Sequence, residues 1–264
     1  MLDAVGQVWS HLDVFVLMMI RVTALIVSSP IFGRRNIPNQ SQIGLCLFLT
    51  YIVFTVNPVA VAAPLAINGI FQYAIVCISE LLFGLILGYV TTLFFSVVQT
   101  AGYVIDMQMG FGMVNVFDVQ NNIQVPITGN FLYIMLSISF FVTNGHHQLI
   151  QILLNTFKVI APGQVQLSGA IGWAAAEVFI LAFLLAVNVA MPIIASGLLG
   201  ELILAFIVRT TPQMNVFVVG IPLKIFLGFL VLLILLPVYT SYTSGIFTEM
   251  FRAVEYMIQG LAGP

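Results

Sequence analysis

The chain has 264 residues, of which 61% are hydrophobic and 6% are charged, and its formal net charge at pH 7 is -2. Soluble domains carry about 25% charged residues, so this sequence has too few charges to cover a surface exposed to water. The composition predicts a membrane protein, much of whose surface is covered by lipid or by other helices, and the net charge argues against nucleic-acid binding. The two cysteines, Cys46 and Cys77, lie in apolar runs without C-x-x-C spacing, so neither a metal site nor a disulfide framework is expected.

Six apolar runs are long enough to cross a bilayer, which requires about 20 mainly apolar residues. Backbone polar groups in lipid must be satisfied within the segment, so each run is expected to be a helix. The predicted fold class is therefore all-α, a polytopic membrane-type protein of about six long apolar helices. In chain order the runs are Val14–Phe32, Ile43–Ala66, Ile70–Val98, Ile127–Thr143, Ala174–Leu199 and Val216–Leu236.

Polar interruptions separate these runs at Gly33–Gln42, Gln99–Pro126 and Asn144–Gly172. After the last run, the segment Phe247–Leu261 places apolar residues on one helical face and charged residues on the other. This pattern predicts a C-terminal amphipathic helix that lies on a membrane surface or against a partner, and the sequence does not choose between the two.

Three charged residues lie inside apolar runs: Arg21, Glu80 and Lys224. Charges at membrane depth are costly, so they usually face protein or water and have partners. They could line an ion or proton path, or they could join helices through ion pairs or bonds to carbonyl groups. Three charges on three separate helices do not form a relay, which favours the structural interpretation.

Small and kinking residues also occur within the apolar runs. Pro192 and Pro222 each lack a backbone donor and are expected to kink their helices. Gly84 and Gly88 form a G-x-x-x-G motif, which allows another backbone to approach closely. Kinked helices suit a transporter or a pore, and equally a protein whose helices curve around a partner.

The interruption Gln99–Pro126 is rich in methionine, phenylalanine and glycine. Methionine is flexible and fills irregular gaps, and glycine lets the chain bend. Such a segment could form a soft seal that deforms around a passing molecule, or it could be an ordinary connecting loop.

Sequence motifs of enzymes are absent. The chain contains no H-E-x-x-H, G-x-S-x-G or Walker motif. Glu80, Glu177 and Glu201 are too dispersed to suggest an intramembrane catalytic pair, and the adjacent His146 and His147 lack further metal ligands. The sequence therefore predicts no enzyme, no metal and no cofactor.

Five short motifs, in order, carry a family resemblance. They are RVTALIVSSPIFGRRNIP at Arg21–Pro38, AGYVIDMQMG at Ala101–Gly110, NGHHQL at Asn144–Leu149, the prolyl helix Asn188–Pro192, and TPQMNVFVVGIPLK at Thr211–Lys224. Together with the length and the order of the apolar runs, they resemble the FliR family across essentially the whole chain. This family comprises the R-type export-gate subunits of flagellar type III secretion and their injectisome relatives.

The resemblance implies a fold, a location and partners. Family members form an export gate in the bacterial inner membrane, at the flagellar basal body, with P-type (FliP) and Q-type (FliQ) subunits and a B-type protein (FlhB). Unfolded flagellar proteins pass through its pore. The chain would be one helical domain, 1–264, of bent helical hairpins, with a P-like part (1–200) and a Q-like part (201–264). Use in a virulence injectisome stays an alternative, and so does a secondary transporter, although the two halves show no clear repeat.

The resemblance also assigns roles to residues. The segment Asp106–Asn122 matches the family's plug, a loop that closes the pore. Arg21 and Lys224 fall within family-like motifs, which favours contacts between helices or subunits over proton conduction. The plug residues expected on this basis are Asp106, Met107, Gln108, Met109, Gly110, Phe111, Gly112, Met113, Phe117 and Asp118.

Overall fold

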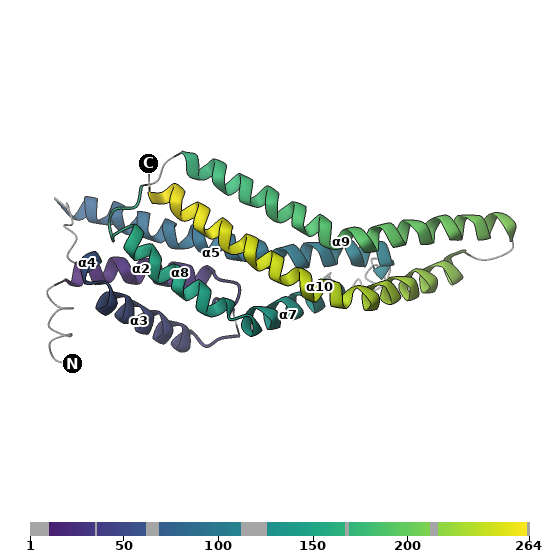
Figure 1. Cartoon of the computed structure of the whole chain (residues 1–264), viewed down its shortest axis with the longest axis horizontal. Helices are drawn as coiled ribbons and strands as arrows, with labels where there is room; N and C mark the ends of the chain where they lie inside the picture. Colours follow the sequence, from purple (N-terminus) through teal and green to yellow (C-terminus); the bar gives the residue numbers. More distant parts are fainter. Residues whose placement is uncertain are drawn as a thin grey trace. The chain divides into compact units, whose positions relative to one another are not determined.

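The computed structural model describes residues 11–34, 36–61, 69–111, 126–166, 169–211 and 216–262 (Figure 1). These residues form helices joined by short connections and contain no strand, so the predicted all-α class is confirmed. The helices are α2 (Leu12–Ser28), α3 (Asn39–Val56), α4 (Pro58–Val61), α5 (Ile70–Met109), α7 (Ile127–Val142), α8 (Gly145–Val159), α9 (Ala170–Thr210) and α10 (Val216–Ala262).

Prolines end two of the predicted runs early. The residue before a proline is restricted to extended conformations, and Ser29, which precedes Pro30, has φ -68° and ψ 136°. Helix α2 therefore ends at Ser28 and not at Phe32. The second run is interrupted at Asn57, after which α4 begins at Pro58.

The prediction that Asn144–Gly172 is a polar interruption was wrong for most of that segment. Residues 145–159 form helix α8, whose buried side chains include Leu149, Leu153 and Phe157. This spacing places the three residues on one helical face. The helix contains no continuous apolar run because its other face is polar.

Three long helices, α5, α9 and α10, continue past the predicted ends of their apolar runs. Helix α5 extends beyond Val98 to Met109, and Ala101, Ile105 and Met109 are buried along one of its faces. The first part of the interruption Gln99–Pro126 is thus helical. Its sequence has no continuous apolar run because polar residues occur on its exposed face, as at Gln99 and Thr100, and also on its buried face, as at Asp106.

The amphipathic helix predicted at Phe247–Leu261 is the end of α10, a helix of 47 residues. Its apolar side chains Met250, Val254, Met257 and Leu261 are buried within the described chain. The chain itself therefore covers this face, and the two predicted covers, a membrane surface or a partner, were wrong for it.

Among the described residues, four helices are long and apolar enough to cross a membrane: α3, α5, α9 and α10. The count rises to five if α7 and α8 form one broken span. This confirms a polytopic membrane protein, with fewer spans than the six apolar runs. The most apolar window of α10 is only 17% buried within the chain, so lipid or other proteins cover the rest of its surface.

The chain divides into two compact units, and α5, α9 and α10 contribute to both. Unit 1 comprises Met1–Leu93, Asn144–Phe179 and Thr248–Pro264, and unit 2 comprises Phe94–Thr143 and Ile180–Phe247. The expected P-like and Q-like parts concern similarity to other subunits, so this division does not test them.

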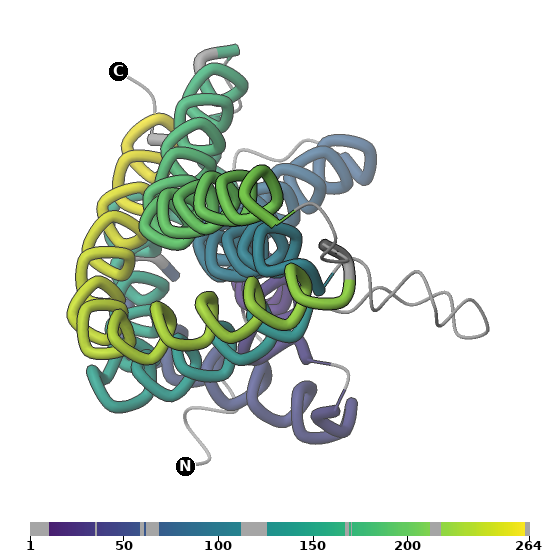
Figure 2. Tube along the Cα trace, turned by 90° about the vertical axis from the view of Figure 1, so that its right-hand side faces the viewer, coloured from purple at the N-terminus to yellow at the C-terminus, as the bar shows by residue number. Residues whose placement is uncertain are grey.

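In unit 1, α2 packs against α3 and against the first half of α5. The G-x-x-x-G motif of α5 makes the second contact. A Cβ atom on Gly84 would lie 2.5 Å from the carbonyl oxygen of Arg21, and one on Gly88 would overlap the Ser28 hydroxyl. The close packing predicted for this motif is confirmed. The end of α10 lies beside the start of α9 (Figure 2), where the Tyr256 hydroxyl donates to the Glu177 carboxylate at 3.0 Å.

The core of unit 2 contains an aromatic cluster that joins three helices. The ring of Phe140 on α7 lies 5.5 Å from that of Phe95 on α5 and 5.4 Å from that of Phe247 on α10, both edge-on. Edge-on aromatic pairs stabilise packing by about 0.5–1.5 kcal/mol beyond the area they bury. This cluster holds together the helices that carry the candidate site.

Candidate functional site

The first candidate site is the end of α5, where the segment expected to act as a plug begins. Asp106 is 6% exposed, and both of its carboxylate oxygens accept from the Thr128 backbone N–H at 3.2 Å. Thr128 lies in the first turn of α7, which begins after Pro126 and has no side-chain cap of its own. A carboxylate satisfies a free N–H there and interacts favourably with the helix dipole. Asp106 therefore caps α7 from a different helix.

Two glycines allow this cap to form. A Cβ atom on Gly102 of α5 would overlap the backbone of Gly129 on α7. Gly102 lies one helical turn before Asp106, on the same face of α5. The two backbones can therefore touch, and the carboxylate reaches the start of α7. This fixes both ends of the connection between α5 and α7.

The next residues of α5 point toward two other helices. The side chain of Gln108 lies against Gly197 of α9, and that of Met109 lies against Gly228 of α10. Met109 is 2% exposed, whereas Met107 is 59% exposed. Each residue of an α-helix turns about 100°, so Asp106, Gln108 and Met109 face different neighbours.

The contacts of Met109 and Gln108 have opposite effects on the free energy of folding. Burying Met109 stabilises its position by about 1.5–3 kcal/mol. The buried Nε2 of Gln108 has no hydrogen-bond partner among the described residues, and an unsatisfied amide costs about 1–3 kcal/mol. The favourable burial of Met109 and the unfavourable burial of the Gln108 amide therefore nearly cancel in free energy. A small cavity of about 10 Å³ lies beside these side chains, at the lower limit for one water molecule.

The end of α5 is also held beyond Met109. Gly110 has φ 86°, in the left-handed region that favours glycine. The chain turns there, and the ring of Phe111 packs edge-on against that of Phe229 on α10, with centroids 5.7 Å apart. The remaining expected plug residues, Gly112, Met113, Phe117 and Asp118, lie outside the described residues.

An ion pair joins α9 and α10 next to this helix end. Lys224 Nζ lies 2.7 Å from Glu201 Oε1, and the side chains are 28% and 47% exposed. Glu201 lies one turn after Gly197, and Lys224 one turn before Gly228, so the pair is on the same faces as these two glycines. Lys224, expected to make a contact between helices or subunits, contacts a neighbouring helix of the same chain.

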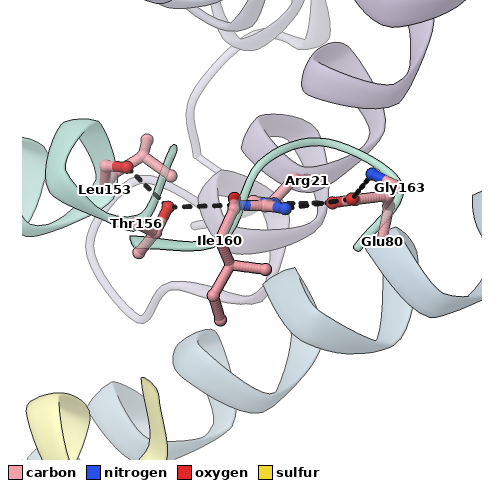
Figure 3. A network of polar contacts seen from close by, with 6 residues as sticks. All are labelled: Arg21, Glu80, Leu153, Thr156, Ile160 and Gly163. Atoms are coloured by element: carbon pink, nitrogen blue, oxygen red, sulfur yellow. Dashed lines mark hydrogen bonds and ion pairs between the residues drawn. The ribbon is translucent and has the colours of Figure 1, made fainter. Parts of the chain in front are cut away.

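The second candidate site is a buried charge network in unit 1 (Figure 3). Arg21 donates to the Glu80 carboxylate through Nε at 2.6 Å and through a terminal nitrogen at 2.9 Å, and both side chains are 0% exposed. The other terminal nitrogen donates to the Ile160 carbonyl at 3.1 Å and reaches the Thr156 hydroxyl at 3.5 Å. Glu80 also accepts from the Gly163 N–H at 2.7 Å. The pair thus fixes the segment that follows α8.

Aromatic rings complete the surroundings of Arg21. The centre of its guanidinium group lies 4.4 Å from the ring centroids of both Phe83 and Phe157. A desolvated cation over an aromatic face is stabilised by about 2 kcal/mol. Fixed partners therefore surround this charge, which suits a structural role; that role stays a prediction.

The two prolines expected to kink helices lie inside them, Pro192 in α9 and Pro222 in α10. Pro192 leaves a carbonyl without its helical donor. The carbonyl of the nearby Val189 accepts from the Tyr239 hydroxyl of α10 at 2.9 Å. Kinking at either proline stays a prediction.

Comparison with known proteins decides the family. The sequence profile of bacterial export proteins, family 1, matches residues 12–250. The flagellar biosynthetic protein FliR of Bacillus subtilis (strain 168) is 34% identical over 247 residues, which cover 92% of this chain and 94% of that protein. The chain belongs to the FliR family of bacterial export proteins. FliR of Escherichia coli (strain K12) is 28% identical over 262 residues, which cover 99% of this chain and 99% of that protein. FliR of Aquifex aeolicus (strain VF5) is 29% identical over 244 residues, which cover 92% of this chain and 93% of that protein.

The FliR resemblance is confirmed over nearly the whole chain. The chain is a membrane component of flagellum biogenesis and protein export, and its family is a structural part of transport machinery. Within the described parts of the chain, no group of three His, Cys, Asp or Glu side chains could hold a metal ion.

Sequence reasoning missed the residues that hold the end of α5. Thr128, Gly197 and Gly228 carry no local signal, because each matters only through the side chain it meets on another helix. The sequence suggests no partner for Glu201, whereas the structure pairs it with Lys224. The one available signal was the small size of the glycines within apolar helices.

Proposed function

We propose that the chain is the R-type subunit of the flagellar export gate. With P-type and Q-type subunits and a B-type protein, it forms the pore in the bacterial inner membrane, at the basal body, through which unfolded flagellar proteins are exported. The segment Asp106–Asn122 is the plug of the closed pore. The chain has no catalytic activity and no cofactor in this role.

The observation that carries the plug assignment is the anchoring of the segment at its base. Asp106 caps α7, Gln108 and Met109 are seated on α9 and α10, and Phe111 packs on α10. Three helices thus hold the chain where the segment begins. A segment with an anchored base and a Met/Phe/Gly-rich body can close a pore and deform when a substrate passes.

The exposed apolar surface supports the assignment to a multi-subunit gate. Phe206 on α9 is 67% exposed, and Phe226 and Leu233 on α10 are 63% and 64% exposed. Side chains of this kind require lipid or protein cover. P-type and Q-type subunits would supply part of it, in line with the proposed likeness of 1–200 to the P-type subunit and of 201–264 to the Q-type subunit.

A replacement of the plug body tests the proposal. Residues 112–122 are replaced by a four-residue Gly/Ser linker, which keeps Asp106, Met109 and Thr128 in place. The control carries the same linker in place of residues 63–67, which precede α5. Both variants are captured from membranes to ask whether P-type and Q-type subunits co-purify, and ion conductance across the membrane is measured in the same cells.

We expect the plug variant to assemble with both partners and to conduct ions, and the control to assemble and stay closed. An assembled plug variant that conducts no more than the control would refute the plug. A wild-type chain that purifies alone, without either partner, would refute the gate assignment itself.

A further inference from the structure

We propose that Gly197 and Gly228 are positioning residues that seat the base of the plug in its closed position. Each glycine forms a socket for one side chain of α5, Gln108 in the first and Met109 in the second. The inference rests on the proposed function of the plug and adds the residues that determine how firmly it is held.

Both sockets exist only because the residue is glycine. A Cβ atom at position 197 would lie 2.5 Å from Gln108 Cγ and 2.6 Å from its Nε2. A Cβ atom at position 228 would overlap Met109 Cγ and lie 2.7 Å from its Cε. Real Cβ contacts are not this short, so any larger residue displaces the α5 side chain.

Two other glycines of the same helices, Gly200 and Gly245, do not make such contacts, so a socket is not a feature of every glycine in α9 and α10. A Cβ atom on Gly200 of α9 would meet only Leu227, at 3.4 Å, which is an ordinary contact. A Cβ atom on Gly245 of α10 would have no atom within 4 Å in the described structure. Glycine weakens a helix interior, so two glycines that coincide with two α5 side chains require a packing reason.

The ion pair Lys224–Glu201 links the two helices that carry the sockets. It joins α10 to α9 at 2.7 Å, one helical turn from Gly228 and from Gly197. A shift of α9 against α10 would therefore move both sockets and strain the pair. The sockets and the ion pair form one structural element.

The seating depends on shape, which suits a contact that must release. Gln108 Nε2 is buried without a hydrogen-bond partner among the described residues, and the Met109 side chain is flexible and apolar. Leaving the sockets breaks no hydrogen bond of either side chain within the described structure. A substrate that displaces the plug can thus also lift the Gln108 and Met109 side chains from their sockets.

The first test adds one methyl group to each socket. Gly197→Ala and Gly228→Ala are compared with Gly200→Ala and Gly245→Ala in gates that retain their partner subunits. We expect about a tenfold rise in ion conductance for the socket variants, because overpacking acts on the seated state alone, and no change for the controls. Assembled socket variants that stay as closed as the controls would overturn the proposal.

A second test does not depend on how the gate tolerates a methyl group. Met109→Cys and Gly228→Cys are combined in a chain in which Cys46 and Cys77 are replaced by alanine. Met109 Cγ lies close to the Cβ position of residue 228, so the two thiols are within reach of a disulfide. We expect oxidation to stop export and reduction to restore it, whereas Met109→Cys with Gly245→Cys does neither.

The outcomes separate this inference from the proposed function. Failure of the disulfide to form, or continued export with the disulfide in place, overturns the sockets and leaves the plug standing. If replacement of residues 112–122 leaves the gate closed, the plug itself is refuted. In that case a disulfide between positions 109 and 228 still tests the geometry of the seat.

Discussion

Replacing Glu80 by glutamine is the sharpest test of the buried charge network. The substitution keeps the size of the side chain and removes its charge, which leaves the Arg21 guanidinium in a site that is 0% exposed without a counter-ion. Breaking a buried ion pair in this way costs about 3–5 kcal/mol of folding free energy. This value includes the loss of hydrogen bonds that Arg21 donates to the Glu80 carboxylate.

The exposed pair of unit 2 provides the matched control. Glu201→Gln removes the same charge from an ion pair of similar length, 2.7 Å, whose side chains are 28% and 47% exposed. Such pairs contribute about 0–1 kcal/mol. The two variants change the same chemical group, so the difference between them measures the effect of burial.

The assay is equilibrium unfolding of the detergent-solubilised protein in increasing SDS. A companion variant replaces Arg21 by methionine and Glu80 by leucine. Removing both charges avoids an unpaired buried ion, so this variant should be more stable than Glu80→Gln. It should remain below the wild type, because the Gly163 N–H and the Ile160 carbonyl lose their partners. A loss below about 1 kcal/mol for Glu80→Gln, equal to that of the control, would refute a paired and buried Arg21.

Three further variants test the helix contacts, each by the same unfolding assay. Asp106→Ala removes the cap of α7 and should cost about 0.5–2 kcal/mol of folding free energy. If the cap anchors the plug, the same variant should also raise the ion conductance of the assembled gate. An unchanged stability would contradict the cap. Gly84→Ala forces α2 away from α5 and should cost about 1–3 kcal/mol of folding free energy. The control Gly44→Ala should be neutral or stabilising, because no atom lies within 4 Å of the added carbon in the described structure. Equal effects of the two variants would contradict the close approach of α2 and α5. Tyr239→Phe removes the hydrogen bond from the buried hydroxyl to the Val189 carbonyl of α9 and should cost about 1 kcal/mol. No change in stability would mean that this bond does not contribute.

Much of the fold was predictable because hydropathy and helical periodicity are local properties. The low share of charged residues and the long apolar runs indicated a helical membrane protein, and each run overlaps a helix. Helix α8 and the extension of α5 contain no long apolar run and were not predicted, whereas the end of α10 was predicted from its helical period as the amphipathic helix Phe247–Leu261. In these segments only one helical face is apolar, so the average hydropathy is low although the period is regular.

The candidate sites were predictable by residue type and not by partner. Arg21, Glu80 and Lys224 could be singled out from the sequence, because a charge within an apolar run requires an explanation. Arg21 and Glu80 are 59 residues apart, and nothing local to either indicates that they meet. Which charge pairs with which depends on the packing of α2 against α5 and of α9 against α10.

Hydropathy, helical period and short motifs are enough to identify the class of the protein, its family and the position of the segment expected to be the plug. The anchoring of that segment becomes visible only once the helices are packed. Their packing brings Asp106 to the start of α7, and it places Gln108 and Met109 on Gly197 and Gly228. A glycine leaves room for a neighbouring side chain but carries no group that identifies it. The contact therefore follows only from the packing of the helices.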